Sequence, residues 1–264
     1  MRSSNPVLTR NDTFHRDAAV GGPLTDQHLE SIYGQPSYTP PGRVTTGGRM
    51  TLDDVVAKTG LLFLLALVTA AGAWVFEVGM GIAIVAALVG FGLAMVNSFK
   101  RQVSPPLVLA YAGVEGIFLG ALTPVLSERF PGIAIQAVAG TAAAFMVMLL
   151  LYRSGRLRAT PMFTKVLVGL GLGYLVFIIG NLAVTAFTDS GVALWEQSPL
   201  SIGISIFAVG LASLFLILDF DQIERGIASG APDTESWRAA FGLMVTLVWL
   251  YVEMLRLISL LRGD

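Results

Sequence analysis

The sequence predicts an all-α membrane protein with seven transmembrane helices. Of the 264 residues, 54% are hydrophobic and 13% are charged, whereas a soluble domain carries about 25% charged residues. The apolar residues gather in runs of about 20 residues, the length at which a helix crosses roughly 30 Å of hydrocarbon. The seven runs are 57–76, 79–98, 106–126, 132–152, 166–187, 199–218 and 239–261. We therefore expect a multi-pass protein whose first partner is the lipid bilayer, with no nucleic acid bound.

The segment before the first run differs from the rest of the chain. Residues 1–50 are rich in Ser, Thr, Pro, Gly and charge and show no apolar periodicity, which predicts a disordered tail. No apolar core follows its early basic patch, so it does not resemble a signal peptide. The predicted domains are this tail, 1–50, and a seven-helix transmembrane domain, 51–264. The tail could be a handle for partners or proteases, or an extension with no specific role.

Short links and prolines mark where each run begins. Little more than Glu77 and Val78 separates the first two runs, which predicts a tight helical hairpin. Pro105 and Pro106 open the third run, where a missing N–H is harmless. Pro131-Gly132 precedes the fourth run, and Ser198-Pro199 begins the sixth.

The basic residues predict the orientation, because Lys and Arg collect on the cytoplasmic side. The flanks on the expected cytoplasmic side hold Arg43, Arg49, Lys58, Lys100, Arg101, Arg153, Arg156, Arg158, Lys165, Arg225 and Arg238. The opposite side holds only Arg129 and Arg262. We therefore expect a cytoplasmic N-terminus and, after seven crossings, a C-terminus outside.

Two pairs of glycines have the spacing GxxxG. Gly116 and Gly120 lie in the third run, and Gly169 and Gly173 lie in the fifth. Small residues at this spacing let helix backbones approach closely. We interpret both pairs as sites of helix packing.

Glu115 is an acid near the midpoint of the third run. A carboxylate at the bilayer centre costs about 2.5–3.5 kcal/mol on insertion scales, so such a residue is a candidate for function. Its neighbours at helical spacing are Ala112, Tyr111, Phe118 and Leu119, from which we expect no partner. Glu115 is then either protonated or bonded to another helix, for structure or for function.

A second group of acids ends the sixth run, in the sequence LDFDQIERG. Asp219 lies deepest, and if the helix continues to about residue 227 it shares a face with Gln222. Asp221 is undecided between a functional acid and a solvated helix end, and Glu224 fits the solvated end. The spacing does not match an EF-hand calcium loop, because position 12 counted from Asp219 is a glycine.

Glu253 lies inside the last run, and two partners for it remain open. Arg256 is three residues away and can meet it on one face of the helix, which lowers the cost of both charges. Alternatively, Glu253 faces Asp219 across the bundle. Two close carboxylates cannot both ionise cheaply, so such a pair shares a proton and works as a pH-responsive latch.

Enzyme chemistry has little support. The chain has no cysteine, and its two histidines, His15 and His28, lie in the polar tail. Gly203-Ile-Ser205 matches the GxS element of intramembrane serine proteases, but no membrane histidine is available as a base. The motifs GxGD, HExxH and the P-loop are absent from the sequence. We expect no enzyme and no cofactor, and we leave the presence of a metal site open.

Three motifs resemble those of the Bax inhibitor-1/YccA family, above all its bacterial branch with a long polar N-terminal tail. They are EGIFLG at 115–120, LDFDQIERG at 218–226 and WLYVEMLRLISLL at 249–261. The resemblance covers about 57–262 and leaves out the tail. It implies a central seventh helix wrapped by two three-helix sets, and a multi-pass protein of a bacterial plasma membrane.

The resemblance also implies a calcium leak gated by pH. In the family, an acid ending helix six shares a proton with an aspartate in helix seven. Asp219 matches the first acid, and Glu253 matches the second, although the family usually has Asp at that place. A basic residue of helix two balances the pair in the family, for which Lys100 and Arg101 are the candidates here. Glu115 matches the acid of the third-helix motif.

Two hypotheses for function follow. The first is an ion channel, a pH-sensing leak for Ca²⁺ or another cation along Glu115, Asp219 and Glu253, in which Ca²⁺ is the permeant ion and not a cofactor. The second is an interaction protein that regulates a membrane-bound quality-control protease or other membrane proteins, with the tail as a handle.

Overall fold

The seven predicted spans are present as seven helices within the part of the chain that the structure describes. This computed structural model describes residues 48–188 and 191–263, so residues 1–47 of the predicted tail lie outside the described residues. Every helix is long and apolar enough to cross a membrane, which confirms the predicted fold class. The helices are α3 (Leu52–Val75), α4 (Met80–Phe99), α5 (Pro105–Arg129), α6 (Ile133–Arg153), α7 (Pro161–Thr188), α8 (Pro199–Ala228) and α9 (Glu235–Arg262).

The helix ends follow local capping chemistry. Thr51 precedes α3, and its hydroxyl accepts a hydrogen bond from the backbone N–H of Asp54 at 3.2 Å. Ser198 precedes α8 and accepts from the N–H of Ser201 at 3.0 Å. Side-chain oxygens at this position satisfy N–H groups that have no partner within the helix. α8 continues well beyond its apolar run to Ala228, so the condition under which Asp219 and Gln222 share a helix face is met.

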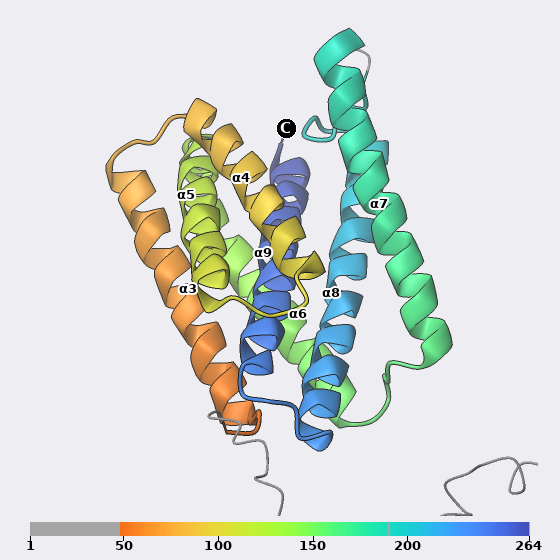
Figure 1. The fold of residues 1–264 in the computed structure, drawn as a ribbon. Coiled ribbons are helices and arrows are strands. Elements are labelled where there is room, and N and C mark those ends of the chain that lie inside the picture. Colours follow the sequence, from red (N-terminus) through yellow and green to blue (C-terminus); the bar gives the residue numbers. More distant parts are fainter. Residues whose placement is uncertain (1–47, 189–190, 264) are drawn as a thin grey trace, which may run out of the picture. The chain divides into compact units, whose positions relative to one another are not determined.

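α9 is the most enclosed helix of the bundle. Its side chains pack against α3, α5, α6 and α8, and Figure 1 shows it between α3 and α8. Fully buried residues run along much of its length, including Ala240, Met244, Leu250 and Leu255. Further contacts join α3 and α4 to α5, and α6 and α7 to α8, and smaller ones join α5 to α6 and α3 to α8.

The glycine pair of α5 marks a close approach between two helices. A side chain at Gly116 would meet the backbone of Ala66 at 2.3 Å, and one at Gly120 would meet the backbone of Ala70 at 2.2 Å. Only glycine leaves room for α3 at these two positions. The packing role predicted for this GxxxG pair is confirmed.

The glycine pair of α7 behaves differently. In the described part of the chain, no atom lies within 4 Å of where a side chain at Gly169 or Gly173 would begin. α7 packs chiefly on α8, and much of its apolar surface is exposed. The pair therefore makes no close packing contact with the described residues, contrary to our interpretation of the sequence.

Met50 joins the helical bundle although the sequence analysis assigns it to the tail. Its side chain is only 4% exposed, and its N–H donates to the carbonyl of Ala231 at 2.8 Å. Arg49 forms an isolated antiparallel bridge with Pro232. The chain just before α3 is thus held against the link between α8 and α9.

Candidate functional site

A buried ion pair lies on α9. Glu253 and Arg256 are one helical turn apart, and an Nη2 atom of Arg256 lies 2.7 Å from Oε2 of Glu253. Their side chains are only 7% and 5% exposed, respectively. Of the two partners left open by the sequence, Glu253 therefore takes Arg256. The pairing offsets the cost of placing either charge in an apolar interior.

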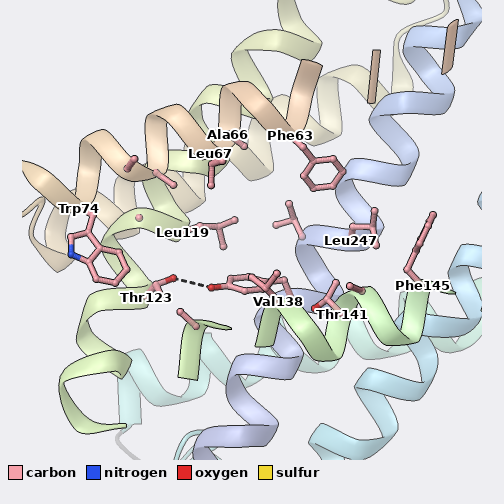
Figure 2. A pocket seen from close by; sticks show the side chains of 17 residues that line it. Phe63, Ala66, Leu67, Trp74, Leu119, Thr123, Val138, Thr141, Phe145 and Leu247 are labelled. Atoms are coloured by element: carbon pink, nitrogen blue, oxygen red, sulfur yellow. Dashed lines mark hydrogen bonds between the residues drawn. The ribbon is translucent and has the colours of Figure 1, made fainter. Parts of the chain in front are cut away.

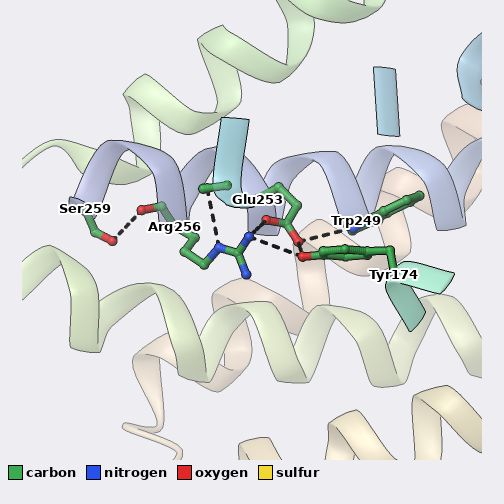
Figure 3. A network of polar contacts seen from close by, with 6 residues as sticks. Tyr174, Trp249, Glu253, Arg256 and Ser259 are labelled. Carbon is green, nitrogen blue, oxygen red and sulfur yellow. Dashed lines mark hydrogen bonds and ion pairs between the residues drawn. The ribbon is translucent and has the colours of Figure 1, made fainter. Parts of the chain in front are cut away.

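Tyr174 of α7 completes this pair from a neighbouring helix. Its hydroxyl donates to Oε1 of Glu253 at 2.6 Å and accepts from Nη2 of Arg256 at 3.2 Å. Trp249 donates to the same glutamate oxygen at 3.3 Å and stacks on the Tyr174 ring. Figure 3 shows these side chains converging on Glu253. Helices α7 and α9 are thereby joined through charge-assisted hydrogen bonds.

Arg256 also reaches α8. Its Nε donates to the hydroxyl of Ser205 at 3.4 Å, and Ser205 is fully buried. The serine that resembled a protease element therefore accepts from a guanidinium. Tyr174 was not among the residues predicted from the sequence, although a tyrosine hydroxyl inside an apolar run requires a hydrogen-bond partner.

Asp219 lies against α9 at another level of the bundle. A side chain at Gly242 would meet Oδ1 of Asp219 at 3.3 Å, and the carboxyl group lies near the side chain of Thr246. The other carboxylate oxygen, Oδ2, is buried and has no hydrogen-bond partner among the described residues. Asp219 is thus a buried acid with at least one unpartnered carboxylate oxygen among the described residues.

The predicted latch between Asp219 and Glu253 is not formed in this structure. Asp219 faces Thr246, which precedes Glu253 by two turns of α9, or about 10 Å along a helix axis. The described contacts of Glu253 go to Tyr174, Trp249 and Arg256. The two acids therefore have separate partners and do not share a proton here.

Glu115 is held between α4 and α5. A side chain at Gly90 of α4 would meet Oε1 of Glu115 at 2.9 Å, and the carboxyl group interacts with Tyr111, one turn earlier on α5. Our expectation that nothing at helical spacing could pair with Glu115 was wrong. The tyrosine ring contributes to the apolar core, and its hydroxyl can still reach the acid.

The secondary candidates lie near the ends of the helices. Asp221 forms an ion pair with Arg225, whose side chain is 69% exposed. Glu224 accepts from Tyr152 of α6 at an exposed position. The exposed Lys100 and Arg101 accept hydrogen bonds from Arg238 through their backbone carbonyls. In the described residues the basic side chain beside Glu253 is that of Arg256, on the same helix.

The acids of the described residues do not assemble into a metal site. No group of three His, Asp or Glu side chains in residues 48–188 and 191–263 could hold a metal ion together. Glu115, Asp219 and Glu253 each have their own partners on three different pairs of helices.

A comparison of the sequence with models of protein families identifies the family of this chain. The family model described as Bax inhibitor 1 like matches residues 5–263. The chain belongs to the Bax inhibitor 1 like family. The match begins at residue 5, so it includes most of the tail, which our resemblance left out. A comparison with curated proteins finds no match.

Membership of the Bax inhibitor 1 like family supports the multi-pass topology. The matched region contains all seven described helices, α3 to α9. It also contains the three motifs at 115–120, 218–226 and 249–261. The buried pair of Glu253 and Arg256 therefore lies within the region that the family model matches.

Proposed function

We propose that this Bax inhibitor 1 like protein is a pH-sensitive leak for Ca²⁺ or another cation, with Asp219 as the group whose ionisation opens it. The observation that carries the proposal is the buried Oδ2 of Asp219, which has no hydrogen-bond partner among the described residues. An ionised carboxylate in that position is costly, and protonation removes the cost. Ionisation therefore favours an arrangement in which water and cations reach Asp219.

The contact between α8 and α9 is where such a change would occur. Gly242 leaves space beside Asp219, since a side chain there would meet the carboxylate at 3.3 Å. Glu253 is already neutralised by Arg256, so we assign it to holding α7, α8 and α9 together. This assignment replaces the proton-sharing pair with a single titrating acid.

The test is calcium flux into liposomes that contain the purified protein. We expect flux to rise between pH 6 and pH 8, because ionised Asp219 attracts cations and protonated Asp219 does not. Asp219→Asn should give low flux that no longer varies with pH. Asp221→Asn is the matched control, because it removes the same charge two residues further along α8, from an acid that is paired with the exposed Arg225. It should keep the wild-type profile.

Two outcomes would contradict the proposal. One is flux no greater than that of empty liposomes across this pH range. The other is an equal loss of pH dependence in Asp219→Asn and Asp221→Asn, which would indicate a general effect of surface charge.

We propose as a second candidate that the protein regulates a membrane protein such as a quality-control protease. The observation that favours it is an apolar groove on α7 and α8, lined by Gly169, Gly173, Tyr174, Phe177, Ile204 and Phe207. Both glycines lack close neighbours within the described chain, and small residues of this kind let another helix approach closely.

This candidate predicts two results that the leak does not. Deleting residues 1–45 should lengthen the lifetime of the protein in cells without changing flux, because a protease needs an unstructured handle. Gly173→Leu should reduce cross-linking to other membrane proteins. Gly180→Leu is the control, since it lies on α7 with no neighbour within 4 Å in the described residues and outside the groove. Unchanged lifetime and cross-linking would exclude the candidate.

A further inference from the structure

A second cavity lies among α3, α5, α6 and α9, apart from the acids described above. It measures about 550 Å³, a size typical of sites that bind small molecules. Its walls are almost entirely apolar, and Figure 2 shows Trp74 toward one end and Phe145 toward the other. Its lining residues include none of the acids Glu115, Asp219 and Glu253.

The cavity is open on the side where the protein meets lipid. Leu67 of α3 and Val138 of α6 line it, and they are 68% and 57% exposed, respectively. Its back wall includes Gly120 of α5 and Val248 of α9, which are buried. The cavity is therefore a cleft between two lipid-facing helices that reaches the central helix α9.

The length of the cleft matches one leaflet of a bilayer. On α3 its lining runs from Phe63 to Trp74, and on α6 from Ala134 to Phe145. Each stretch rises about 16 Å at 1.5 Å per residue, close to half of a hydrocarbon core that is roughly 30 Å thick. Trp74 lies one residue before the end of α3, where tryptophan favours the membrane interface.

Most of the few polar side chains in the cleft already have a hydrogen-bond partner. The hydroxyls of Thr123 and Tyr251 lie 3.3 Å apart and bond to each other. The hydroxyl of Thr141 is buried without a hydrogen-bond partner in the described chain. With so little polar surface, the cleft fits a hydrocarbon chain better than a polar solute.

We propose that this cleft binds one acyl chain of a bilayer phospholipid, with its headgroup near Trp74 and its methyl end toward Phe63 and Phe145. The occupant is a lipid and not a second protein helix, because the volume of about 550 Å³ over a length of about 16 Å leaves a mean cross-section of about 34 Å². A helix about 10 Å wide with its side chains needs about 80 Å². The lipid thereby becomes part of the packing around α9.

The test uses phosphatidylcholine with a photoactivatable diazirine midway along one acyl chain, in liposomes that contain the full-length protein. After illumination, labelled peptides are mapped by mass spectrometry. We expect label on α9 at Leu247, Val248 or Tyr251, which line the cleft. Lipid that merely surrounds the protein would label exposed residues of α3, α4, α6 and α7 alone, and that result would overturn the proposal.

Two neighbouring alanines of α6 supply a matched pair of variants. Ala142 lines the cleft and Ala143 does not, and both are exposed. Ala142→Trp should reduce the label on α9 several-fold, whereas Ala143→Trp should leave it unchanged. Equal labelling in both variants would overturn the proposal.

A third variant tests whether the occupant is held as a hydrocarbon. Thr141→Val removes the unpaired hydroxyl and keeps the side-chain volume nearly the same. A bound acyl chain should label α9 as strongly as before, or more strongly. A loss of label would overturn the identification, because it would mean that a hydrogen bond to Thr141 holds the occupant.

Discussion

Glu253 and Arg256 form a buried ion pair across one turn of α9, with 2.7 Å between the glutamate oxygen and the guanidinium nitrogen. Tyr174 from α7 bonds to both members, and Ser205 from α8 bonds to the arginine. A pair that is internal to one helix therefore also joins two others. Substitutions can separate the contribution of this ion pair to stability from that of the packing between the three helices.

Removing one member of this pair should be much worse than removing both. Arg256→Met leaves Glu253 buried without its counter-charge, and we expect the free energy of unfolding to fall by about 3–5 kcal/mol. The double variant Glu253→Gln with Arg256→Met should recover much of this loss. Unfolding in mixed micelles of detergent and SDS measures both. A double variant as unstable as the sum of the two single variants would contradict the coupling.

The Tyr174 hydroxyl should contribute more than an exposed tyrosine hydroxyl does. Tyr174→Phe keeps the stacking on Trp249 but loses the bonds to Glu253 and Arg256, so we expect a loss of about 1.5–3 kcal/mol. Tyr152→Phe removes a bond to Glu224 at an exposed position and should cost less than about 1 kcal/mol. Equal losses in the same unfolding assay would show that the buried pair does not depend on Tyr174.

The contact of α3 with α5 should not tolerate even one added methyl group at Gly120. Gly120→Ala would place Cβ 2.2 Å from the backbone of Ala70, so the helices must separate, at a cost of about 1–3 kcal/mol. Gly92→Ala is the control, because no atom of the described chain lies within 4 Å of its new methyl group. Thermal unfolding in detergent would distinguish the two variants. A normal midpoint for Gly120→Ala would contradict the close packing.

Met50 should stabilise the bundle although it precedes the first helix. Met50→Ala removes a side chain that packs beside Gly226, Phe220 and Ile223, and we expect a loss of about 2–5 kcal/mol. Leu52→Ala, at a side chain that is 58% exposed, should change stability by less than about 0.5 kcal/mol. If the two variants behave alike, residue 50 belongs to the tail and not to the bundle.

The sequence could predict the number of spans, their approximate limits and the family. The length of an apolar run is a local property, and roughly 20 residues are needed to cross a bilayer. Local chemistry also placed Pro105 and Pro199 at the first positions of α5 and α8, and the spacing of Gly116 and Gly120 predicted a close helix contact.

Only the tertiary structure decided which side chains meet. Asp219 lies opposite Thr246 and not opposite Glu253, because the link between α8 and α9 sets how far the two helices are displaced along each other. Thr246 and Glu253 are two turns apart on α9, which corresponds to about 10 Å at 1.5 Å per residue. No sequence motif reveals this separation between Asp219 and Glu253. The partners of Tyr174 and the cleft between α3 and α6 likewise depend on contacts between helices that are distant in the sequence.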